Sequence, residues 1–172
     1  MIFDVDKHEL NLEYDYNPEG ETDALEKVME RVRNGDRELI EKDLLRVYLW
    51  KLNRVPKLAQ QTIKKLESLA KDPELDPFSD EVRDLLDELK DTHGVSYPTA
   101  STFLRFLRPE VFPIIDRRAY RALFGKATTY YTTDKYFNYM RKVHEICKKK
   151  KMTAAQVDEQ LYQWDIKHNG KL

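Results

Sequence analysis

From residue 22 onward, apolar side chains recur with the 3.6-residue period of an α-helix, and this pattern constrains the fold more than any other feature. Glycine and proline interrupt it at short intervals, which predicts about eight helices with no long internal repeat. Helix starts are expected at Ser79, at Pro98, and after Asp116, Asp134 and Thr153, and Thr153 has the capping-box spacing to Gln156. The stretch after Asp36 is apolar around much of its circumference, so we expect it to be the central helix.

The first part of the chain has a different charge from the rest. Residues 1–30 carry ten acidic side chains against Lys7 and Lys27, which leaves 28 basic and 21 acidic side chains in the remainder. We therefore predict an acidic N-terminal arm (residues 1–20), with or without a short strand, and one helical domain (residues 21–172). The arm is a candidate contact for a protein partner. The basic stretch 98–126 either attracts phosphate or is a solvated helical face.

Composition excludes several classes of protein. Cys147 is the only cysteine, so an internal disulfide and a cysteine-based metal site are excluded. No apolar run approaches the roughly 20 residues that a membrane-spanning helix needs, and the acidic N-terminus is unlike a signal peptide. We therefore expect no contact with a membrane and a cytoplasmic, nucleoid-associated or otherwise intracellular location.

Residues 89–101 place two helices around a very short turn. Gly94 permits a left-handed backbone, Val95 can fill the space between the helices, and the second helix presents unpaired N–H groups at its start. Such N–H groups can hold a phosphate oxygen. An ordinary helical hairpin with a glycine C-cap accounts for the same residues, so both interpretations stay open.

A short apolar run, Phe112-Pro113-Ile114-Ile115, leads to Asp116 at the start of another helix. Asp116 is a good N-cap residue, and this alone explains an aspartate at that place. A carboxylate there can also face a developing positive charge on a sugar or deprotonate an attacking water.

The turn and the aspartate together resemble the helix-hairpin-helix DNA glycosylase superfamily. In that family a Leu-x-Gly-Val-Gly-x-x-x-Ala turn precedes an apolar run that ends in the catalytic aspartate. Here Gly94 and Asp116 are 22 positions apart, and Phe-Pro-Ile-Ile-Asp is similar to the adenine and 8-oxoguanine glycosylase branch. The resemblance implies a mainly α, multi-helix glycosylase-like fold, double-stranded DNA as the partner, and hydrolytic base excision in DNA repair.

The same resemblance assigns roles to individual residues. Gly94, Val95 and Ser96 would grip a DNA phosphate, with a monovalent cation at the hairpin and no other cofactor, and Asp116 would be the catalytic carboxylate. Ser96 replaces the family's second glycine. Pro98 stands where strand-cleaving members have their Schiff-base lysine, which implies a monofunctional glycosylase. The family's four cluster-binding cysteines are missing, so an iron-sulfur cluster is excluded.

Further residues are expected to handle the DNA. The loop after Trp50 would supply the wedge that fills the vacated base stack, through Asn53 or Arg54. Trp50, Tyr97, Tyr120 and the Tyr130-Tyr131 pair are candidates for stacking on a flipped base. Phosphate contacts are expected from three arginines, of which the last two could instead lower the pKa of the neighbouring carboxylate: Arg105, Arg117 and Arg118.

Two other functions fit the same sequence. One is a non-catalytic DNA-binding or damage-recognising module, in which Asp116 is only a helix cap. The other is a protein-interaction domain in which the hairpin is purely architectural. The salt dependence of DNA affinity separates the second from both DNA hypotheses, because phosphate contacts release counterions.

Overall fold

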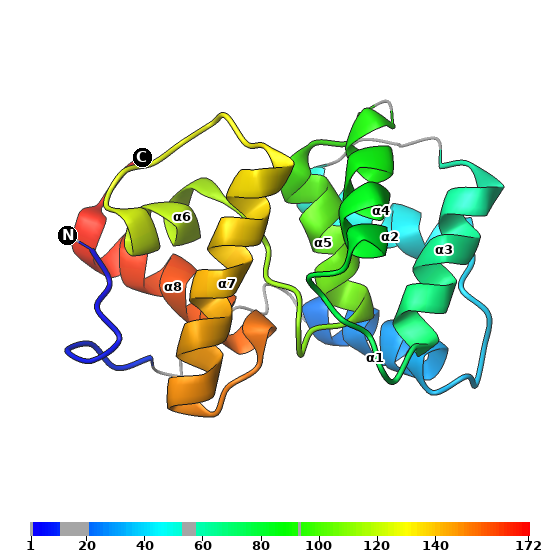
Figure 1. Ribbon diagram of the computed structural model, residues 1–172, viewed down its shortest axis with the longest axis horizontal. Coiled ribbons are helices and arrows are strands. Elements are labelled where there is room, and N and C mark those ends of the chain that lie inside the picture. Colours follow the sequence, from blue (N-terminus) through cyan, green and yellow to red (C-terminus); the bar gives the residue numbers. More distant parts are fainter. Residues whose placement is uncertain (1, 11–20, 53–57, 93) are drawn as a thin grey trace.

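The computed structural model describes residues 2–10, 21–52, 58–92 and 94–172 (Figure 1). In these ranges the protein is all-helical, with eight helices and no strand, which confirms the predicted mainly α class. The helices are α1 (Glu21–Arg33), α2 (Glu41–Leu52), α3 (Gln60–Lys71), α4 (Asp80–Asp91), α5 (Tyr97–Leu107), α6 (Arg117–Phe124), α7 (Thr133–Lys150) and α8 (Ala154–Asn169).

The helices form two lobes that lie side by side (Figure 1). In the first lobe, α1 to α4 all pack against α5, and in the second, α6 and α7 pack against α8. Residues 108–116 cross from the first lobe to the second, and α4 also contacts α7. The hairpin turn and Asp116 therefore belong to different lobes.

The central helix of the first lobe is α5, not the helix that follows Asp36. Every residue from Thr99 to Leu107 is buried. On α2, by contrast, Leu49 is 46% exposed, although Leu44, Val47 and Tyr48 are fully buried. The apolar circumference of α2 was thus a misleading signal, because one of its apolar residues faces solvent.

Side-chain caps fix several helix starts where the sequence predicts them. The Ser79 hydroxyl accepts a hydrogen bond from the Val82 N–H at 3.3 Å and begins α4. Thr153 and Gln156 form a complete capping box at the start of α8. Pro98 lies in the first turn of α5, where its missing N–H costs nothing.

The described part of the N-terminal arm packs on the second lobe and forms no strand. Phe3 is 5% exposed, its N–H donates to the Ala122 carbonyl, and its ring meets Trp164 edge-on. Residues 11–20 lie outside the described residues. The expected boundary near residue 20 therefore does not separate residues 2–10 from the core.

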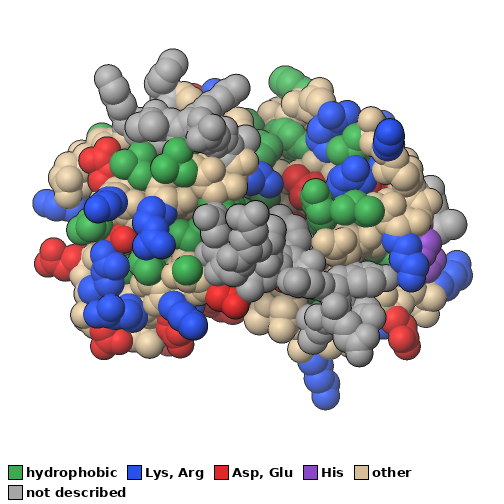
Figure 2. Space-filling model, turned by 180° about the vertical axis from the view of Figure 1, so that it is seen from behind, with side chains coloured by type: hydrophobic (Ala, Val, Ile, Leu, Met, Phe, Trp, Pro, Cys, Tyr) green, Lys and Arg blue, Asp and Glu red, His purple; other side chains and the backbone are tan. Residues whose placement is uncertain are grey.

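Charged side chains cover both lobes. On the face shown in Figure 2, Lys and Arg side chains are spread over the two lobes and interspersed with Asp and Glu. None of the described helices is long and apolar enough to cross a membrane.

Candidate functional site at the junction of the lobes

The segment that leads to Asp116 is buried and held by side chains of both lobes. Phe112 and Ile115 are fully buried. The Ile115 N–H donates to the Ser101 hydroxyl of α5 at 3.1 Å, and the Ile114 N–H donates to the Asp158 carboxylate of α8 at 3.2 Å. These bonds satisfy backbone groups that water cannot reach and fix the position of Asp116.

Asp116 is the N-cap of α6. Its Oδ1 accepts hydrogen bonds from the N–H groups of Arg118 at 2.6 Å and Ala119 at 3.0 Å. Burial raises the pKa of the Asp116 carboxyl, while the positive charge of Lys51 and the two N–H donors act in the opposite direction. The predicted role of Asp116 as a helix N-cap is therefore confirmed, and this role uses only one of its two carboxylate oxygens.

A second aspartate lies in the core beside the first. Asp158 of α8 is 4% exposed, and it accepts hydrogen bonds from the Ile114 N–H and, at 2.9 Å, from the Tyr139 hydroxyl. Burial raises the pKa of Asp158 well above its ordinary value, and the nearby charge of Asp116 raises it further. Two close carboxyl groups of this kind resist being ionised together.

The hairpin turn has the geometry that its glycine predicts. Gly94 has a φ of +80°, and its carbonyl accepts a 2.6 Å hydrogen bond from the Tyr48 hydroxyl of α2. A Cβ on Gly94 would lie 3.0 Å from that hydroxyl. Val95 is buried as expected, and Ser96 is the N-cap of α5 but makes no side-chain cap bond to it. The first turn of α5 carries no acidic residue of its own.

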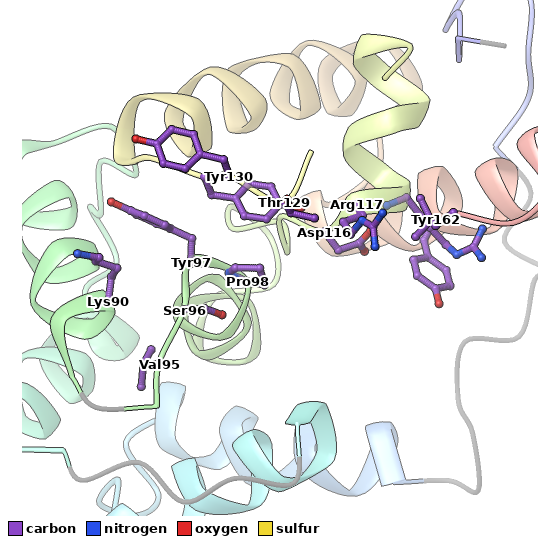
Figure 3. Close-up of a pocket in the computed structure, with 13 residues that line it drawn as sticks. Lys90, Val95, Ser96, Tyr97, Pro98, Asp116, Arg117, Thr129, Tyr130 and Tyr162 are labelled. Carbon is purple, nitrogen blue, oxygen red and sulfur yellow. The ribbon is translucent and has the colours of Figure 1, made fainter. Parts of the chain in front are cut away.

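A cavity of about 690 Å³ joins the turn to Asp116. Its lining comes from the hairpin, the start of α6, the α6–α7 segment and the C-terminal region: Lys90, Val95, Ser96, Tyr97, Pro98, Asp116, Arg117, Arg118, Thr129, Tyr130, Tyr131, Tyr162 and Leu172. Figure 3 shows the hairpin residues on one side of this space, with Tyr130 above Tyr97 and with Asp116 and Arg117 farther along.

Tyr97 is a fixed wall of the cavity. Its hydroxyl shares a 2.9 Å hydrogen bond with Thr133 of α7 and lies 3.4 Å from the Asp87 carboxylate of α4, to which Thr133 also donates. The ring is therefore held between three helices. Tyr130, in contrast, is 70% exposed, and the Lys135 ammonium lies 4.8 Å from its ring centroid.

The arginines next to Asp116 have different surroundings. Arg117 is exposed and makes no ion pair within the described part of the chain. Arg118 lies 3.2 Å from the Asp165 carboxylate and donates to the Gly170 carbonyl at 3.1 Å, so part of its charge is already used. Lys90, across the cavity, forms a 2.7 Å surface ion pair with Asp91.

Arg105 lies outside the site, so the expectation that it contacts a DNA phosphate is wrong. Its side chain is 2% exposed and forms ion pairs with Glu26 of α1, at 2.6 Å, and with Glu159 of α8. A side chain enclosed in this way cannot reach DNA. Arg105 instead ties the two lobes together.

Other expected residues are only partly placed. The wedge candidates Asn53 and Arg54 lie outside the described residues. Tyr120 is in the core, stacked on Phe124 with ring centroids 4.4 Å apart, and Trp50 packs edge-on against Phe106. Neither of these two rings lines the cavity.

Two residues near Asp116, Lys51 and Asp158, were not expected from the sequence, and a third, Tyr131, was expected only as a base-stacking residue. The positive charge of Lys51, in the last turn of α2, opposes the rise that burial gives to the pKa of Asp116. Asp158 and Tyr131 come from segments 42 and 15 positions downstream of Asp116. No spacing rule links them, since only the packing of α2, α7 and α8 brings them together.

Within the described ranges, no group of three or more His, Cys, Asp or Glu side chains could hold a metal ion. The cation expected at the hairpin stays a prediction, because residue 93 of that turn is outside the described residues. Comparison with protein-family models, curated proteins and solved structures gives no match for this chain.

Proposed function

We propose that this protein binds double-stranded DNA and acts as a monofunctional DNA glycosylase, with Asp116 as the catalytic carboxylate. The observation that carries the proposal is the cavity between the lobes, which has the Asp116 carboxylate on one wall and the hairpin turn on the other. Its volume of about 690 Å³ is within the range of small-ligand sites, and a flipped nucleotide is a ligand of that size.

The residues around the cavity suit a DNA backbone and an extruded base. Arg117 supplies an exposed positive charge, and the start of α5 supplies N–H groups from a turn that carries no acidic residue of its own. The rings of Tyr97 and Tyr130 offer faces on which a base can stack. We therefore infer that the backbone lies along the hairpin and that the target nucleotide enters the cavity.

The proposed reaction is dissociative hydrolysis of the N-glycosidic bond. As the bond between C1′ and the base breaks, positive charge develops on the sugar, and the Asp116 carboxylate stabilises that charge in surroundings largely free of water. The two N–H donors and the positive charge of Lys51 favour the ionised form of Asp116, against the effect of its burial. Pro98 has no amine, so no Schiff base forms at its place and the product is an intact abasic strand.

The test is base release from duplexes that carry oxidised, deaminated, alkylated or mismatched bases, read as strand cleavage after hot alkali. Asp116→Asn keeps an oxygen that caps α6 but carries no negative charge, so we expect it to bind DNA and release no base. Asp116→Ala removes the cap as well, and should also unfold about 1 kcal/mol more easily. Full activity in Asp116→Asn would disprove the catalytic role.

A second function is favoured by one observation, the complete N-cap geometry of Asp116. The two N–H donors on Oδ1 explain why an aspartate stands at this position even if it catalyses nothing. This is what a non-catalytic DNA-binding module requires. Salt-dependent binding without base release from any duplex would support this function. DNA binding with no salt dependence would exclude both the glycosylase and the non-catalytic DNA-binding module, because phosphate contacts weaken as the salt concentration rises.

A further inference from the structure

The hydroxyl of Tyr131 is buried and has no hydrogen-bond partner among the described residues. Other inward-facing tyrosine hydroxyls here are bonded: Tyr136 donates to the Pro113 carbonyl at 3.1 Å, and Tyr139 donates to Asp158. A buried hydroxyl that bonds to nothing is costly. Tyr131 is therefore an exception for which the fold alone gives no reason.

The place of Tyr131 suggests what its hydroxyl serves. The residue lies between α6 and α7, its ring contacts Tyr120 edge-on, and it lines the same cavity as Asp116. The Asp116 charge is near enough to add to the effect of burial in raising the pKa of Tyr131. The hydroxyl therefore stays protonated and can donate, yet it makes no direct hydrogen bond to Asp116.

We propose that Tyr131 and Asp116 together hold the attacking water, with the Tyr131 hydroxyl donating to the water oxygen and the Asp116 carboxylate accepting a water proton. This inference rests on the proposed glycosylase function. In the reaction the bond between C1′ and the base breaks, and its electron pair leaves with the base, which gains a proton from solvent. The water oxygen then bonds to C1′, and its proton passes to Asp116.

Tyr131→Phe tests the proposal, because it removes only the hydroxyl. Without its donor the water is held less well, so the single-turnover rate of base release should fall on the order of 10²-fold with unchanged duplex affinity. The temperature of thermal unfolding should not fall, because the substitution removes no hydrogen bond within the protein. Tyr136→Phe is the matched control. It should lower the unfolding temperature, because the Tyr136 hydroxyl donates a hydrogen bond to the Pro113 carbonyl.

A competing nucleophile gives a readout that a structural role would not change. In added methanol, the wild type should form a fixed ratio of methyl glycoside to hydrolysed sugar, and Tyr131→Phe should shift that ratio toward the methyl glycoside. An unchanged rate and ratio in an active protein would overturn the role of Tyr131. Failure of the wild type to release any base would instead overturn the proposed function itself.

Discussion

Arg105 and Arg117 belong to the same basic stretch of sequence but differ in their surroundings. Arg105 is buried between Glu26 and Glu159, and even so its Nε has no partner among the described residues. Arg117 is exposed at the cavity mouth. The first is therefore a structural charge, and the second is free to meet a phosphate.

Substituting each arginine by glutamine should separate the two roles. Arg105→Gln leaves two carboxylates without their shared cation, so we expect a loss of about 3 kcal/mol in the free energy of unfolding. Arg117→Gln should leave stability nearly unchanged and reduce the slope of log affinity against log salt by about 1. Urea unfolding and DNA titrations at several salt concentrations measure both. A reduced salt slope in a folded Arg105→Gln protein would contradict this assignment.

The sequence could not distinguish these arginines, because what buries Arg105 is far away along the chain. Glu26 is 79 positions before it and Glu159 is 54 positions after it. Local composition indicates only that a region is basic. The cap role of Asp116 could be predicted, since it depends on the N–H groups of the second and third residues after it.

At the scale of elements, the hairpin between α4 and α5 combines a left-handed glycine with a close contact. Gly94 has a φ of +80° and lies against the Tyr48 hydroxyl, whereas Gly35 after α1 has a φ of +76° and open space around it. Only the first position therefore restricts both the backbone conformation and the volume.

Alanine substitutions at the two glycines should measure these effects separately. Gly35→Ala carries only the cost of the left-handed backbone, roughly 1–2 kcal/mol. Gly94→Ala carries the same cost and also pushes Tyr48 from the Gly94 carbonyl, so its loss should be larger by about 1 kcal/mol. Urea unfolding of both variants gives the comparison, and equal losses would show that the Tyr48 contact is unimportant.

Helix starts were predictable where a cap is encoded within four residues, as at Ser79 and Thr153. The helix at the centre of the first lobe was predicted wrongly, as α2 instead of α5. α5 is central because four other helices pack around it, and its sequence carries one charged residue whereas that of α2 carries five. Hydrophobicity along one helix does not reveal which neighbours surround it.

At the scale of the whole molecule, Asp158 connects the helix α8 to the segment that joins the lobes. Its pKa in the folded state is raised by burial and by Asp116. The protonated form is therefore favoured on folding. The contribution of Asp158 to stability is greatest at a pH below the ordinary aspartate pKa, and it is lost as the pH rises through the raised value.

Asp158→Asn should remove this pH dependence. The asparagine resembles the protonated acid, since its oxygen can accept from the Ile114 N–H while its amide faces the Tyr139 hydroxyl, which donates to Asp158 in the wild type. Relative to the wild type, we expect the variant to gain unfolding free energy as pH rises, by roughly 1.4 kcal/mol for each unit by which the pKa is raised. Urea unfolding from pH 5 to pH 9 checks this. Parallel curves for the two proteins would mean that Asp158 does not titrate in that range.

The contact of Phe3 with Ala122 and Trp164 has a consequence for how the chain folds. The first lobe can be completed from contacts within residues 21–107, whereas the second lobe needs a residue near position 3 to meet residues more than 100 positions later. Closing so long a loop is entropically costly and slow. We therefore expect the α1–α5 lobe to form early, and the second lobe to be completed last, when the arm docks on α6 and α8.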